Sequence, residues 1–182
     1  MKLQRIFLIL LGIILLNSSC NAQSNTTEGT TSGGIKWMSF EEAVAKCDKN
    51  PKKIFIDVYT GWCGWCKRMD ATTFKDSSII NYMTEHYYAV KLDAETKDTI
   101  HFKDKIFTYK TESKANELAL SLLNGQMSYP SFVFLDEKYQ LLSPLQGFNT
   151  VEQITPVLRY FGENIYLTKK WEDYQKGLSK TE

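Results

Sequence analysis

A run of apolar and β-branched residues that leads directly into a cysteine pair constrains this chain more than any other feature. Lys53–Tyr59 has the length and composition of a buried strand, and Thr60-Gly61 turns the chain after it. Cys63-Gly64-Trp65-Cys66 then stands where a helix is expected to start. Exposed N–H groups and the helix dipole stabilise a thiolate there, and the thiolate is the form that attacks a disulfide. We therefore expect Cys63 to be a nucleophile and Cys66, one turn later, to resolve the mixed disulfide.

Strand and helix signals alternate on both sides of this motif, which predicts an α/β fold with a central mixed β-sheet flanked by helices. Ser39 to Glu42 form a capping box, and Asp76 and Thr150 are expected to cap later helices. Pro156 predicts a kink or a break in the last main helix. The expected strands are 35–38, 53–59, 87–93, 131–135 and 141–145, with a hairpin over 99–109, and the expected helices are 39–49, one from about 63 to past 69, 76–86, 114–123, 150–161 and 165–178.

Length and composition bound the class of protein. The chain has 182 residues, of which 43% are hydrophobic, enough for one domain with its own core. Its 22 basic and 21 acidic side chains give a net charge of +1, so the sequence carries no electrostatic footprint for nucleic acid. Four cysteines are too few for a disulfide-built scaffold of this length.

The N-terminus has the pattern of an export signal. Lys2 and Arg5 precede an apolar run over residues 6–16 that is about half the length needed to span a bilayer. Two alternative processing sites fit this pattern. Either cleavage follows Ala22, giving a signal peptide over 1–22, or residues 1–19 are a lipoprotein signal and Cys20 becomes lipidated. Residues 23–34 are mostly Asn, Ser, Thr and Gly, which predicts a flexible linker.

The segment Val58-Tyr59-Thr60-Gly61-Trp62-Cys63-Gly64-Trp65-Cys66-Lys67 resembles the active-site segment of the thioredoxin superfamily. Asp57 stands where these proteins carry a buried acid, six residues before the first cysteine, and Lys91 where they carry a lysine on the next strand. Tyr129-Pro130 fits their cis-proline, and Gly147 fits a glycine near the end of the last strand. The signal and the C-terminal extension look like the exported thioredoxin-like proteins of Bacteroidetes-type bacteria.

The resemblance implies a thioredoxin-like domain over 35–163, with an insertion over about 97–125 and a C-terminal helical tail over 164–182. It departs from thioredoxin in the Gly64-Trp65 dipeptide between the cysteines. By analogy, Asp57 and Lys91 join Cys63 and Cys66 in catalysis, with Asp57 accepting a proton as Cys66 attacks. A further set is expected to bind substrate: Trp62, Gly64, Trp65, Tyr129 and Pro130.

Enzymatic thiol–disulfide exchange with protein substrates is the favoured function, with reduction as the favoured direction. We expect no cofactor beyond a redox-active Cys63–Cys66 disulfide, a membrane or periplasmic redox partner, and a monomer in the periplasm, anchored to the membrane only if Cys20 is lipidated. The alternative is a redox-sensitive adaptor that binds a partner without turnover.

Other uses of the cysteines and histidines are weaker. A zinc site needs four ligands, and Cys47, His86 and His101 stand alone in the sequence, so no metal is expected. Cys47 is expected to be a small buried hydrophobe, and the histidines to lie at the surface or on an edge. A purely structural Cys63–Cys66 disulfide would close a loop too small to stabilise the fold much.

Overall fold

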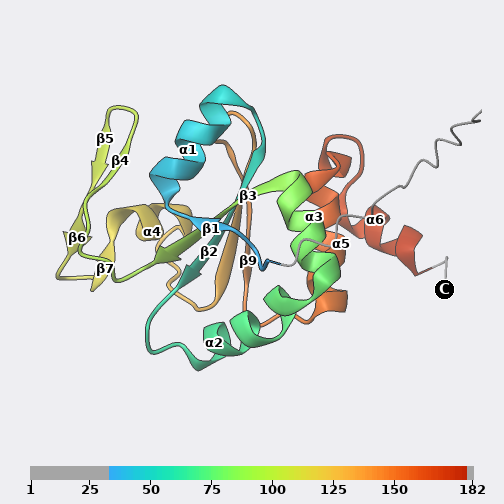
Figure 1. Ribbon diagram of the computed structural model, residues 1–182, viewed down its shortest axis with the longest axis horizontal. Coiled ribbons are helices and arrows are strands. Elements are labelled where there is room, and N and C mark those ends of the chain that lie inside the picture. Colours follow the sequence, from blue (N-terminus) through green and yellow to red (C-terminus); the bar gives the residue numbers. More distant parts are fainter. Residues whose placement is uncertain (1–32, 180–182) are drawn as a thin grey trace, which may run out of the picture.

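A five-stranded mixed sheet forms the centre of the computed structural model, which describes residues 33–179 (Figure 1). The strand order is β1-β3-β2-β8-β9. β1 and β3 run parallel to their neighbours, whereas β8 pairs antiparallel with β2 and β9. The bounds of these strands are β1 Trp37–Met38, β2 Lys53–Tyr59, β3 Tyr87–Asp93, β8 Ser131–Leu135 and β9 Leu141–Gln146. The mixed α/β sandwich expected from the sequence is therefore confirmed.

Helices cover both faces of the sheet: α1 and α4 lie on one side, and α3 and α5 on the other (Figure 1). Their bounds, with those of α2 and α6 and of two short 3₁₀ turns, are α1 Phe40–Lys49, α2 Gly64–Ala71, η1 Thr73–Lys75, α3 Ser77–His86, α4 Glu117–Leu122, α5 Val151–Gly162, η2 Ile165–Leu167 and α6 Trp171–Leu178. The predicted caps are confirmed. Ser39 and Thr150 form capping boxes, and the Asp76 carboxylate accepts from the backbone N–H groups of Ser78 and Ile79.

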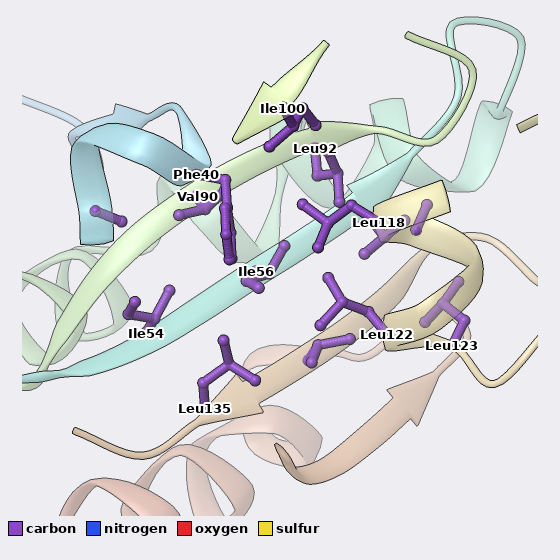
Figure 2. Close-up of a cluster of buried hydrophobic side chains, with 14 of the residues drawn as sticks. Phe40, Ile54, Ile56, Val90, Leu92, Ile100, Leu118, Leu122, Leu123 and Leu135 are labelled. Carbon is purple, nitrogen blue, oxygen red and sulfur yellow. The ribbon is translucent and has the colours of Figure 1, made fainter. Parts of the chain in front are cut away.

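Alternation along β2 divides the core in two, because successive side chains of a strand point to opposite faces. Ile54, Ile56 and Val58 pack beneath α1 and α4, in the cluster that Figure 2 shows. Phe55 packs on the other face, in the cluster that also holds side chains of α2, α3 and α5. Asp57 shares the face of Phe55, so the chain places a carboxyl group inside its aromatic core, directly before the cysteine motif.

Two hairpins and a helix fill the connection between β3 and β8. β4 (Ile100–Phe102) pairs with β5 (Lys105–Phe107), so the expected hairpin around 103–104 is confirmed, and β6 (Tyr109–Lys110) pairs with β7 (Ala115–Asn116). The expected helix over 114–123 starts three residues later than predicted. Lys114 has a left-handed backbone with φ 52°, and Asn116 caps α4 by accepting from the Leu118 N–H at 3.0 Å.

The structure differs from two further predictions, at Pro156 and in the C-terminal tail. Of the kink or break predicted at Pro156, the break is wrong, because α5 is continuous through this residue. Buried Ile154 and Leu158 anchor the helix on both sides of the proline, whose missing N–H frees only the carbonyl of exposed Glu152. The tail forms η2 and α6 rather than one helix. Within residues 33–179, no helix is long and apolar enough to cross a membrane.

Candidate active site

Cys63 and Cys66 are bonded to each other at the N-terminus of α2. Cys63 is the N-cap residue: its Sγ accepts from the backbone N–H of Cys66 at 3.1 Å, and its own N–H donates to the Thr60 carbonyl at 3.1 Å. Both side chains are nearly buried, with 5% of Cys63 and 2% of Cys66 exposed. The first sulfur is thus held where N–H groups and the helix dipole stabilise negative charge, as a nucleophilic thiolate requires.

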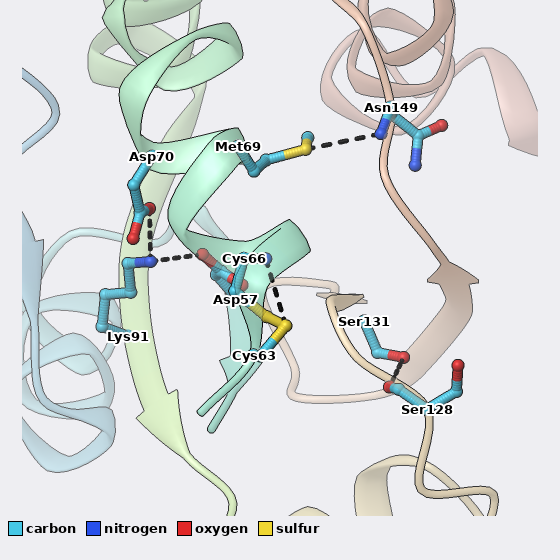
Figure 3. The surroundings of a disulfide bond; sticks show 9 residues. All are labelled: Asp57, Cys63, Cys66, Met69, Asp70, Lys91, Ser128, Ser131 and Asn149. Carbon is cyan, nitrogen blue, oxygen red and sulfur yellow. Dashed lines mark hydrogen bonds and ion pairs between the residues drawn. A yellow bond between two sulfur atoms is a disulfide. The ribbon is translucent and has the colours of Figure 1, made fainter. Parts of the chain in front are cut away.

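A buried carboxyl group lies on the strand that leads to this motif. Asp57 is 1% exposed, and its Oδ2 accepts from Lys91 Nζ at 2.7 Å (Figure 3). The same ammonium donates to Asp70 Oδ1, on α2, at 2.5 Å. Asp57 Oδ1 is buried without a hydrogen-bond partner in the described chain. That oxygen keeps its lone pairs available, so Asp57 retains the capacity to accept a proton.

The protonation of Asp57 is set by opposing effects. Burial raises the pKa of Asp57 from 3.8 to about 6, although the Lys91 ammonium and its hydrogen bond lower it, and the Asp70 charge raises it slightly. For Lys91, the neighbouring negative charges outweigh burial. Burial lowers its pKa, but Asp57 and Asp70 together raise it above the usual value. Lys91 therefore stays an ammonium beside a carboxyl group whose pKa lies close to neutral pH.

Aromatic side chains form two walls beside the disulfide. On one side, the Trp62 indole donates to Glu95 Oε1 at 3.0 Å, and its ring meets Tyr129 edge-on at 5.8 Å between centroids. On the other side, the Trp65 ring lies 5.5 Å from Phe148. Because 67% of Trp62 and 55% of Trp65 are exposed, these rings present apolar surface to solvent. Such surface next to a reactive sulfur suits contact with a polypeptide.

Tyr129 and Pro130 are joined by a cis peptide bond, directly before β8. Pro130 is buried, and its carbonyl accepts from the Gly147 N–H at 2.8 Å. Gly147 has φ 87°, a backbone conformation that L residues rarely adopt, which explains a glycine here. Gly64 is exposed as the first residue of α2, and a Cβ added to it would meet nothing within 4 Å.

The remaining cysteines and histidines lie apart from this site. Cys47 is buried at 1% exposure, and its thiol donates to the Lys52 carbonyl, which agrees with the prediction of a small buried side chain. His86 is half-buried and His101 is exposed. In the described part of the chain, no group of three or more His, Cys, Asp or Glu is arranged to hold a metal ion. Cys20 lies outside the described residues.

Three residues of the site were not predicted from the sequence. Asp70 follows Cys66 by four residues, one helical turn, so helix periodicity could have placed it near the motif. Glu95 and Phe148 carry no comparable local signal. Glu95 reaches Trp62 from the turn after β3, and Phe148 reaches Trp65 from the loop after β9. Both contacts depend on tertiary structure.

Comparison with known proteins gives matches of limited length among curated sequences. Spermatogenesis-associated protein 20 of Homo sapiens is 31% identical over 74 residues, which is 40% of this chain and 9% of that protein. Thiol:disulfide interchange protein DsbD of Campylobacter jejuni is 32% identical over 65 residues, 36% of this chain and 11% of its own length. An uncharacterized protein of Archaeoglobus fulgidus is 26% identical over 99 residues, 54% of this chain and 72% of that protein. The chain thus matches only about a tenth of the first two relatives.

Solved structures share the fold over most of the chain. A structure described as DsbH Oxidoreductase has a TM-score of 0.52 at 18% identity, covering 72% of this chain and 86% of its own. A putative disulphide-isomerase from Bacteroides thetaiotaomicron has a TM-score of 0.53 at 25% identity, covering 75% and 97%.

A family model supplies the assignment that these pairwise matches do not. The model of the Thioredox_DsbH family, described as "Protein of unknown function, DUF255", matches residues 17–155. That match covers most of the chain, including the cysteine motif, Asp57, Lys91 and the Tyr129–Pro130 bond. The chain therefore belongs to the Thioredox_DsbH family, within the thioredoxin superfamily.

Proposed function

We propose that the protein is an exported thiol–disulfide oxidoreductase that exchanges disulfides with protein substrates through Cys63 and Cys66. The observation that carries this proposal is the cysteine pair itself, bonded at a helix N-terminus beside two exposed tryptophans. The activity is that of the thioredoxin-like disulfide oxidoreductases to which the family is related.

In the proposed reduction, the Cys63 thiolate attacks one sulfur of a substrate disulfide. The substrate S–S bond breaks, a mixed disulfide forms at Cys63, and one substrate thiolate leaves. Asp57 takes the proton of the Cys66 thiol, and the Cys66 thiolate attacks the Cys63 sulfur. The second substrate thiolate is released, so the substrate gains two electrons and the protein ends as the Cys63–Cys66 disulfide.

The surrounding residues have separate roles in this proposal. Lys91 keeps the ionised form of Asp57 accessible near neutral pH, because its ammonium offsets part of the burial. Substrate polypeptide contacts the surface made by Trp62, Gly64, Trp65 and the Tyr129–Pro130 edge. Extended backbone beside a cis-proline suits β-like pairing with a substrate strand.

The pair supplies the redox chemistry without an organic cofactor and is reset by a membrane or periplasmic thiol partner. The sequence pattern of an N-terminal signal supports export to the periplasm, with anchoring only through a lipidated Cys20. Reduction is the proposed direction, although the Gly64-Trp65 dipeptide matches neither the Gly-Pro of strong reductants nor the histidine-containing pairs of oxidases.

Reduction of insulin by the purified protein, with a chemical reductant as the electron source, tests the proposal. Wild type should turn over many insulin disulfides, and Cys63→Ser should abolish turnover. Cys66→Ser should instead trap a mixed disulfide at Cys63. Cys47→Ser is the matched control, because Cys47 is buried away from the site, and it should retain activity. Absence of turnover in wild type would favour the adaptor function, as would rescue of a deletion strain by a Cys63→Ser, Cys66→Ser protein.

A further inference from the structure

The turn after β3 forms part of the wall beside the disulfide. Ala94 N–H donates to the Tyr59 carbonyl at 2.8 Å, which ties this turn to the end of β2. The Asp93 carboxylate accepts from the Glu95 N–H at 2.9 Å. Glu95 in turn accepts from the Trp62 indole, next to Cys63. These bonds thus hold the Glu95 carboxylate on Trp62, the neighbour of Cys63, and the Asp93 carboxylate at the start of the same turn.

Asp93 and Glu95 also act electrostatically on the residue before the cis-proline. Partial burial, followed by the charges of Glu95 and Asp93, raises the pKa of Tyr129 above its usual value. Tyr129 packs against Trp62, so the two carboxylates, the indole and the phenol belong to one wall. The negative charge of this wall therefore reaches the place where a bound polypeptide would lie.

Within the described residues, no ion pair neutralises the carboxylates of this wall. Across residues 33–179, neither Asp93 nor Glu95 forms an ion pair. Lys91 is committed to Asp57 and Asp70. Lys97, two residues beyond Glu95, is placed over the Tyr109 ring. A cation brought by a bound substrate would be the partner of these carboxylates.

A cation lies on the rings of the opposite wall. The Arg68 guanidinium lies 5.4 Å from the centroids of both the Trp65 and Phe148 rings, and it has no ion-pair partner in the described chain. The Trp62 side of the disulfide therefore carries the Glu95 carboxylate, and the Trp65 side carries the Arg68 guanidinium. A substrate residue of one charge is favoured on one side of the reacting cysteine and disfavoured on the other.

We propose that Glu95 and Asp93 are specificity-determining residues, which select protein substrates that carry a lysine or arginine on one side of the reacting cysteine. This inference rests on the proposed exchange function and names its substrate class. Glu95 has a second effect, because its hydrogen bond holds the Trp62 ring against Tyr129.

Binding of unreactive peptides tests the inference without requiring turnover. Three peptides with serine in place of the reacting cysteine are compared: one neutral, one with a lysine before the serine and one with a lysine after it. Affinity is followed by the NMR signal of the Trp62 indole N–H. One lysine peptide should bind about threefold more tightly than the neutral one, as an exposed charge pair allows, and the gain should shrink at high salt.

Variants assign the preference to the two carboxylates. Glu95→Gln keeps an oxygen that can accept from the Trp62 indole and removes the charge. It should lose most of the preference, and Glu95→Gln combined with Asp93→Asn should abolish it. Glu172→Gln, on exposed α6, makes the same charge change elsewhere and should keep the preference.

Two results would overturn the inference: equal binding of all three peptides to wild type, or a lysine preference that survives in the double variant. Its failure is separable from that of the proposed function. Lysine-selective binding without insulin reduction would remove the exchange activity and leave the charge recognition standing. Insulin reduction without lysine selectivity would contradict the charge recognition and leave the exchange activity standing.

Discussion

Asp57 makes a specific prediction about stability, because burial raises the pKa of its carboxyl group from 3.8 to about 6. The folded protein then binds a proton more tightly than the unfolded chain, so stability falls as the pH rises from about 4 through 6. Asp57→Asn is neutral at every pH and similar in size. Relative to wild type, its free energy of unfolding should rise by about 2 to 3 kcal/mol between pH 4 and pH 8, since one pKa unit corresponds to about 1.4 kcal/mol.

The assay is urea denaturation of the oxidised proteins at both pH values, in which the bonded Cys63 and Cys66 do not titrate. Any pH-independent cost of the buried amide cancels, because only the change with pH is compared. Lys91 keeps Asp70 as a partner in the variant, so its ammonium is not left unpaired. Asp173→Asn, at a carboxylate that is 64% exposed, is the control and should follow wild type. An Asp57→Asn curve parallel to wild type would refute the raised pKa.

Three other substitutions give independent tests. Asp70→Asn should lower the pKa of Asp57, because a nearby negative charge that raises it is removed; carbon NMR of the Asp57 carboxyl measures this, and an upward shift contradicts it. Trp65→Ala should raise KM for protein disulfides severalfold and change the unfolding free energy by less than about 0.5 kcal/mol, since the ring is largely exposed; a large loss of stability would contradict this. Asn116→Ala should cost about 1 to 3 kcal/mol in urea denaturation, because it removes the cap of α4 and a hydrogen bond to Asp98, and an unchanged midpoint would contradict it.

Local sequence signals predicted the elements that carry the site. The apolar run of β2, the caps at Ser39, Asp76 and Thr150, and the cysteine motif at a helix start all depend on neighbours within a few residues. The pairing of Asp57 with Lys91 came from family resemblance. The sheet explains it, since β2 and β3 place these two residues in register.

The errors lie where tertiary contacts override local preference. The helix expected over 114–123 begins only at Glu117, because the Asn116 N–H donates to the Ala94 carbonyl and Asn116 becomes the cap. Pro156 is tolerated because α5 is anchored by its buried face. Glu95 reaches Trp62 across 33 residues of sequence, a contact that no local pattern indicates.

The reduction potential of the Cys63–Cys66 pair tests the central claim most directly. Trp62 and Trp65 flank the pair, so their fluorescence can follow equilibration with glutathione buffers of defined ratio. The account predicts one two-electron transition between about −270 and −120 mV, toward the reducing end of this range. A pair that stays oxidised in every buffer, with a potential below about −300 mV, would be a structural disulfide and would contradict the account.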